Sequence, residues 1–124
     1  MEMLKSLALT GLLVFAPIKA VIITVGVLIF ADMILGIMAA RKRGEAITSA
    51  GMRRSVTKMF VYQSAVMTGF LVETFLLGGL IPVNKLVGGV IGVVEFKSLL
   101  ENVTEITGTD FKEIIRKLGS KNDE

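Results

Sequence analysis

The chain has 124 residues, of which 52% are hydrophobic, and it contains neither cysteine nor histidine. Several of its runs are apolar on every side, which is typical of helices that have lipid as their solvent, so we predict an all-α integral membrane protein. Without cysteine there is no disulfide or thiolate metal site, and without histidine the commonest general base and metal ligand are missing. We therefore expect no enzyme, no catalytic residue, no metal, no cofactor and no small-molecule substrate.

The first segment, residues 1–17, is apolar but short. Residues 6–18, which lie between Lys5 and Lys19, make about 20 Å of helix, less than the roughly 30 Å of a bilayer core. We predict a short N-terminal amphipathic helix that lies in the membrane interface and is broken at Pro17. A cleaved signal peptide is the alternative interpretation, and a crossing of the membrane by residues 6–18 is left open.

The next run, residues 20–40, is long enough to cross the membrane. Its 21 residues make about 32 Å of helix, which matches the bilayer core. Its one charge is Asp32, whose burial costs about 2.5–3.5 kcal/mol, whereas each Val, Ile, Leu or Phe residue of the run returns about 0.3–0.6 kcal/mol. Because the run holds eleven such residues, it is predicted to be a transmembrane helix that carries Asp32 into the membrane.

A basic loop, residues 41–58, follows this span. Six basic side chains against Glu45 alone give the loop a charge of about +5. Such a cluster can also indicate nucleic-acid binding, but no aromatic residues interleave with it, so no nucleic-acid partner is expected. The positive-inside rule places the loop in the cytoplasm. A new helix is expected to begin near Ser49 or Ser55. The residues that determine this topology are Arg41, Lys42, Arg43, Arg53, Arg54 and Lys58.

Residues 59–80 form the second predicted span, with Glu73 as their single charge. Gly78, Gly79 and Pro82 follow closely, and the short turn that they form makes this span an antiparallel neighbour of the next.

The third predicted span, residues 83–100, is the weakest because Lys85 and Glu95 interrupt it. It crosses if these charged groups lie near the two headgroup layers. Residues 18–100 thus make up the predicted transmembrane domain, which passes three times through the membrane.

Residues 101–124 are predicted to be a cytoplasmic tail. Asp110 with Glu113 resembles a capping box, and the apolar residues after it recur at helical spacing, so we expect a C-terminal amphipathic helix. Residues 120–124 are polar and terminal, and are expected to be disordered.

Each predicted span carries small residues four positions apart. Small residues let transmembrane helices approach closely, so these faces are predicted to mediate helix packing and oligomerisation. Asp32 and Glu73 lie on two of them, and charges inside membranes normally face other helices or water. Whether these two carboxylates line a water-filled path or only pack is left open. The small residues are Gly36, Ala40, Ala65, Gly69, Gly88 and Gly92.

Two motifs carry a resemblance to a known family. The first, Asp-x-x-x-Gly-x-x-x-Ala, occupies residues 32–40, and the second consists of Glu95, Ser98, Glu101 and Asn102. With these elements, residues 30–108 resemble the small phage holins of the toxin-secretion/phage-lysis type. The resemblance implies a homo-oligomer that forms lesions in the bacterial cytoplasmic (inner) membrane, through which an endolysin reaches the cell wall and lyses the host. The partners that it implies are other copies of the chain, membrane lipids, and an antiholin or a phage assembly protein.

Two other functions fit parts of the sequence. A membrane anchor or scaffold subunit without a pore would dock a partner through residues 96–118. A small proton-coupled multidrug transporter is also short and apolar, but it needs four spans and aromatic residues, and this chain has no tryptophan and one tyrosine.

Overall fold

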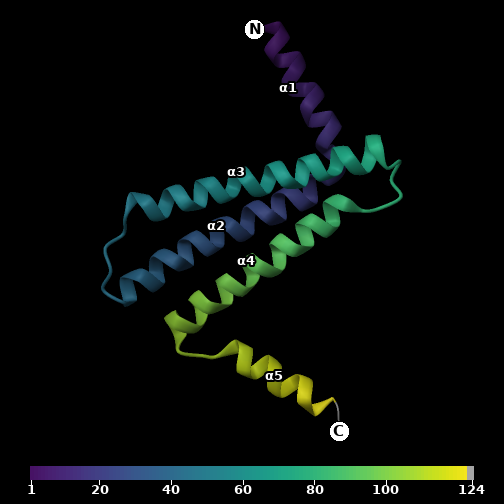
Figure 1. The fold of residues 1–124 in the computed structure, drawn as a ribbon. Helices are drawn as coiled ribbons and strands as arrows, with labels where there is room; N and C mark the ends of the chain where they lie inside the picture. The colour runs from purple at the N-terminus through teal and green to yellow at the C-terminus, as the bar shows by residue number, and fades with distance from the viewer. Residues whose placement is uncertain (123–124) are drawn as a thin grey trace.

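The computed structural model describes residues 1–122 as helices joined by short turns, and the described residues contain no strand. The predicted all-α fold is therefore confirmed. Three long helices lie side by side, and a shorter helix projects from each end of this body (Figure 1). The helices are α1 (Glu2–Phe15), α2 (Lys19–Lys42), α3 (Ser49–Leu71), α4 (Val83–Thr107) and α5 (Phe111–Lys121).

The body is a bundle in which α2 packs most extensively against α4 and also contacts α3. Few side chains are fully buried, because each helix offers the bundle one narrow face. Large apolar residues instead cover the outside, among them Phe30, Phe60 and Val90. An exterior of this kind suits a lipid solvent, in which apolar surface needs no cover. The buried apolar core consists of Ile18, Val25, Ile29, Val66, Phe70 and Ile91.

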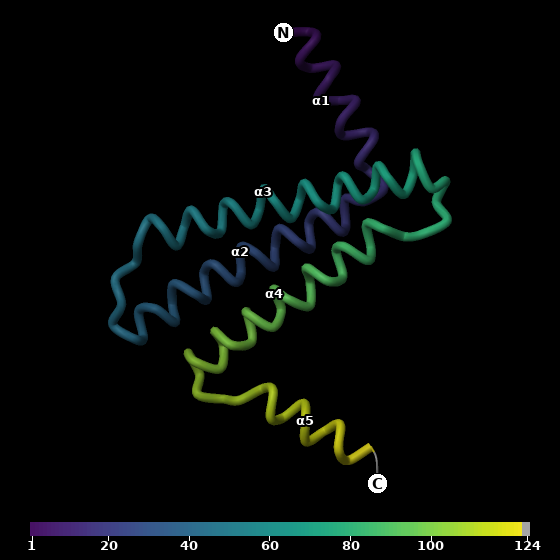
Figure 2. Tube along the Cα trace, viewed as in Figure 1, coloured from purple at the N-terminus to yellow at the C-terminus, as the bar shows by residue number. Residues whose placement is uncertain are grey.

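Two stretches are long and apolar enough to cross a membrane: the 41 residues Glu2–Lys42 and the 28 residues Ser49–Leu76. A straight helix of 41 residues would be about 62 Å long, twice the thickness of a bilayer core. A 3₁₀ turn, Ala16–Ile18, divides this stretch at Pro17, and Figure 2 shows α1 leaving the line of α2 there. The third predicted span lies in α4, which is not one of the two stretches, so its crossing stays a prediction.

The hairpin between α3 and α4 is present as the sequence predicts. After α3, a π-helical turn covers Val72–Leu76, and the chain then reverses through Gly78 and Gly79. Both glycines have positive φ angles, +58° and +79°, a conformation that costs other residues steric strain. The two helices consequently run antiparallel (Figure 1).

The tail helix α5 begins where the sequence predicts. The Asp110 carboxylate accepts hydrogen bonds from the backbone N–H groups of Lys112 and Glu113, at 3.1 and 3.2 Å, and so caps the helix. The predicted disorder of residues 120–124 is wrong for Ser120 and Lys121, which belong to α5. The helix continues through Gly119, and the Ser120 hydroxyl donates a hydrogen bond to the backbone carbonyl of Lys117 within its last turn. Residues 123–124 lie outside the described part of the chain.

At Gly88, α4 packs closely against α2. A Cβ atom added there would lie 2.7 Å from Cγ1 of Val21, whereas one added at the adjacent Gly89 would meet nothing within 4 Å. We expect Gly88→Ala to destabilise the bundle by about 1–3 kcal/mol, because valine has little freedom to move aside.

Gly89→Ala is the matched control. We expect it to leave stability unchanged or to raise it by up to about 1 kcal/mol, since alanine favours helix over glycine. Unfolding of the purified protein by SDS in mixed micelles, followed by circular dichroism, measures both variants. Equal stability of the two variants would contradict the close packing of α2 on α4.

Candidate functional site: a buried ionic cluster

Asp32 lies inside the bundle rather than on its surface, with 8% of its area exposed. Its Oδ1 atom accepts hydrogen bonds from Ser98 Oγ and Asn102 Nδ2, both at 2.9 Å. These two donors come from α4, which runs beside α2. The two motifs that carry the family resemblance therefore meet each other in the folded chain.

Lys58 of α3 completes the cluster. Its Nζ atom lies 3.3 Å from Oδ2 of Asp32 and 3.0 and 3.1 Å from the two carboxylate oxygens of Glu95. Glu95 is 2% exposed. We call Asp32, Lys58, Glu95, Ser98 and Asn102 the ionic cluster. Each of the three bundle helices contributes to it, and its two carboxylates and one ammonium group carry a formal charge of −1.

Lys58 was predicted to belong to the basic loop, and no sequence pattern placed it beside the carboxylates. It lies within α3, because this helix begins at Ser49. One signal was present in the sequence: Glu95, Ser98 and Asn102 are spaced by three and four residues, which puts them on one face of a helix. Glu101 falls outside this face. It is exposed and pairs with Lys112 at 2.9 Å, and the hydrogen bond from Lys112 lowers the pKa of Glu101.

Glu73 does not join the ionic cluster. Its carboxylate accepts two hydrogen bonds of 2.8 Å from the Asn84 side chain and one of 3.3 Å from the Asn84 backbone. Glu73 follows Lys58 by fifteen residues, about 22 Å along a helix, so the two polar sites lie at different levels of the bundle. Sequence reasoning did not identify Asn84, which is buried at the start of α4.

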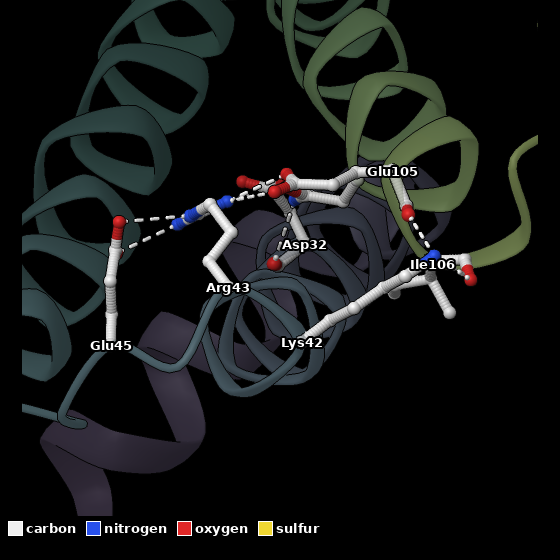
Figure 3. A network of polar contacts seen from close by, with 7 residues as sticks. Asp32, Lys42, Arg43, Glu45, Glu105 and Ile106 are labelled. Atoms are coloured by element: carbon white, nitrogen blue, oxygen red, sulfur yellow. Dashed lines mark hydrogen bonds and ion pairs between the residues drawn. The ribbon is translucent and has the colours of Figure 1, made fainter.

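The basic loop is tied to the end of α4 (Figure 3). The Arg43 guanidinium donates hydrogen bonds to the carboxylate of Glu45 at 3.0 Å and to that of Glu105 at 2.6 Å. This guanidinium holds the pKa of Glu45 below its usual range. Lys42 Nζ donates to the backbone carbonyls of Glu105 and Ile106 at 2.8 and 3.0 Å. Lys42 thereby satisfies carbonyl groups that the helix end leaves without partners and neutralises its partial negative charge.

An open cavity of about 470 Å³ lies between the basic loop and the ionic cluster. Arg43 and Thr48 line it on the loop side, and Asp32, Lys58 and Asn102 line it on the cluster side. The polar groups at the centre of the bundle are therefore next to a hollow that leads toward the loop.

Most of the predicted small residues face other helices of the same chain. A Cβ atom at Gly36 would meet Asn102, one at Gly69 would meet Val83, and one at Gly92 would meet Leu28, all across helix contacts. Gly88 faces Val21 in the same way. Ala40 lines the cavity and Ala65 is exposed. A role of these residues between copies of the chain stays a prediction.

The remaining basic residues of the predicted loop, Arg41, Arg53 and Arg54, are exposed. Arg41 lies in the last turn of α2, and Arg53 and Arg54 lie in the first two turns of α3, so these three charges belong to the ends of two helices rather than to the loop.

A model of the bacteriophage holin family matches residues 10–121. No curated protein and no solved structure matches the chain. The family match includes the three bundle helices and the whole ionic cluster, and it confirms the resemblance found in the sequence motifs. Together with the apolar exterior and the two long apolar helices, it supports a holin-like phage membrane protein. The chain belongs to the bacteriophage holin family.

Proposed function

We propose that the protein oligomerises in the bacterial cytoplasmic membrane and forms lesions through which an endolysin reaches the cell wall. The observation that carries this proposal is the ionic cluster inside an otherwise apolar bundle. A buried ion pair is a poor source of stability, because apolar residues of similar volume usually serve as well or better. Charges kept inside a membrane protein therefore point to a function that needs them.

The hydrogen bonds within one chain support a closed resting state. Asp32, Glu95 and Glu73 all find partners inside the same bundle, so none of these three carboxylates faces lipid without a partner. In the lesion, several copies turn these polar groups toward water, and the apolar faces stay against lipid. The cavity beside the cluster supports this direction of opening, since it already borders Asp32 and Lys58.

The packing supports three crossings, and the charge of the basic loop favours its placement in the cytoplasm. Because α4 packs along α2 more extensively than α3 does, we expect a membrane that α2 crosses to surround α4 as well. Glu95, the charge that weakens the third span, is paired with Lys58 at 3.0 Å, which lowers the cost of burying it. The helix α1 then lies in the interface at the outer end.

Co-expression with an endolysin tests the proposed function. We expect the culture to lose turbidity abruptly after a delay when both proteins are present, because the lesion releases the enzyme to the wall. Endolysin alone is the control and should leave the culture intact. If the holin-family protein accumulates in the membrane at high level and the culture still grows, a membrane anchor or scaffold takes the place of the lesion.

A further inference from the structure

The tail helix α5 carries an apolar face that the bundle leaves uncovered. Phe111, Ile114, Ile115 and Leu118 recur at helical spacing on one side, and Ile115 and Leu118 are 57% and 60% exposed. The main contact of α5 is with the end of α4, through the ion pair of Lys112 with Glu101. Beyond it, α5 turns sharply away from the line of α4 (Figure 2).

A helix of 11 residues is marginal in water without a partner for its apolar face. The charges on the rest of α5 decide between partners. Four basic residues against Glu113 give the helix a charge of +3, so a second copy of α5 would be repelled. An anionic surface, in contrast, would be attracted. The basic residues are Lys112, Arg116, Lys117 and Lys121.

We propose that α5 lies flat on the cytoplasmic surface of the membrane, with its apolar face among the acyl chains and its basic side chains at anionic lipid headgroups. The inference rests on the proposed topology, in which α4 ends at this surface. Residues 108–110 are the link between the two helices and reach about 10 Å at most, so α5 cannot leave the vicinity of the headgroups. Lys121 flanks the apolar face, where its long stem allows the ammonium group to reach the phosphates.

This placement holds the end of α4 at a defined depth. Lys112 connects α5 to Glu101, and Lys42 and Arg43 connect the same end of α4 to the end of α2. A bound α5 thus fixes the level of the bundle against the inner leaflet.

Two single-cysteine variants of the full chain, Leu118→Cys and Ser120→Cys, test the inference. The natural sequence has no cysteine, so a fluorophore attached to each variant reports one position. Leu118 belongs to the apolar face and Ser120 lies on the opposite side of the helix. Each labelled protein is reconstituted in vesicles of phosphatidylcholine alone or with phosphatidylglycerol, with iodide on both sides as the aqueous quencher.

In the anionic vesicles we expect the probe at Leu118 to be protected from iodide and quenched by spin-labelled lipid, and the probe at Ser120 to behave in the opposite way. In phosphatidylcholine alone, the protection of the Leu118 probe should fall. Equal access of iodide to both probes in anionic vesicles would overturn the inference. A different result would be equal protection of the Leu118 probe in both vesicle types, together with disulfide crosslinks between copies of Leu118→Cys. It would show that a second copy of the chain, and not the lipid surface, covers the apolar face of α5.

A charge variant adds a quantitative measure. Arg116→Gln with Lys117→Gln lowers the charge of α5 from +3 to +1. Since each basic residue near an anionic surface contributes about a fivefold factor, the ratio of bound to free α5 should fall about thirtyfold. Arg53→Gln with Arg54→Gln is the matched control, because it removes the same charge from α3, and it should leave the Leu118 probe unchanged.

The position of α5 can be judged independently of the lysis assay, because the probes report depth in the membrane whether or not lesions form.

Labelling of intact cells tests the proposed topology separately. A cysteine at Ser49 should react after permeabilisation alone, and one at Leu80, which is exposed in the α3–α4 turn, should react from outside. If this pattern is reversed, the proposed topology fails. If it holds and the Leu118 probe is accessible, the docking of α5 fails.

Discussion

Replacing Lys58 with methionine is expected to destabilise the bundle by about 3–5 kcal/mol, because it leaves Asp32 and Glu95 buried without a cation. Such a loss is a large part of the 5–15 kcal/mol that holds a typical protein folded. The variant should unfold at a lower SDS fraction in mixed micelles and should accumulate in membranes at a lower level than the parent.

Arg54→Met is the matched control for this variant. It removes the same charge from the same helix, but Arg54 is exposed, so stability should change by less than about 0.5 kcal/mol. A second test changes the carboxylates as well: Lys58→Met combined with Asp32→Asn and Glu95→Gln has no buried charge and should recover most of the lost stability. If Lys58→Met unfolds like Arg54→Met, the ionic cluster does not hold the helices together.

Replacing Asp32 with asparagine is expected to separate stability from lysis. Lys58 keeps its contact with Glu95 at 3.0 Å, and the asparagine oxygen can still accept from Ser98 or Asn102, so the closed bundle should remain folded. The open lesion loses more stability than the closed bundle, because a carboxylate turned toward water is better hydrated than an amide. Each 1.4 kcal/mol or so of lost hydration lowers the population of the open state tenfold. Lysis should therefore start later, as measured by culture turbidity with co-expressed endolysin.

Asp110→Asn is the control for the timing measurement. Asp110 caps α5, outside the predicted spans, and asparagine is an equally good cap, so its lysis should start with that of the parent. If Asp32→Asn also lyses on time at equal expression, Asp32 serves helix packing alone. If Asp32→Asn lyses late and also unfolds more easily than the parent, lower stability explains the delay instead.

Much of the architecture follows from local properties of the sequence. The lengths of the apolar runs predicted the long helices α2 and α3, and Pro17 predicted the break before α2. Gly78 and Gly79 predicted the turn between α3 and α4, because each adopts a positive φ angle. The Asp110 cap predicted the start of α5. Each of these features depends on residues within a few positions of one another, so a sequence pattern contains the information.

The tertiary structure alone decided how the polar groups pair. Asp32 meets Asn102 across seventy positions of the chain, and Lys58 meets Glu95 across thirty-seven. Such contacts depend on how far each helix is rotated about its axis and how it slides along its neighbours. Close contacts such as that of Gly88 with Val21 set the rotation and the sliding of each helix. Neither the length of an apolar run nor its hydropathy encodes these contacts. The sequence by itself determined that a carboxylate enters the bundle, and the packing of three helices determined that Lys58 meets it there.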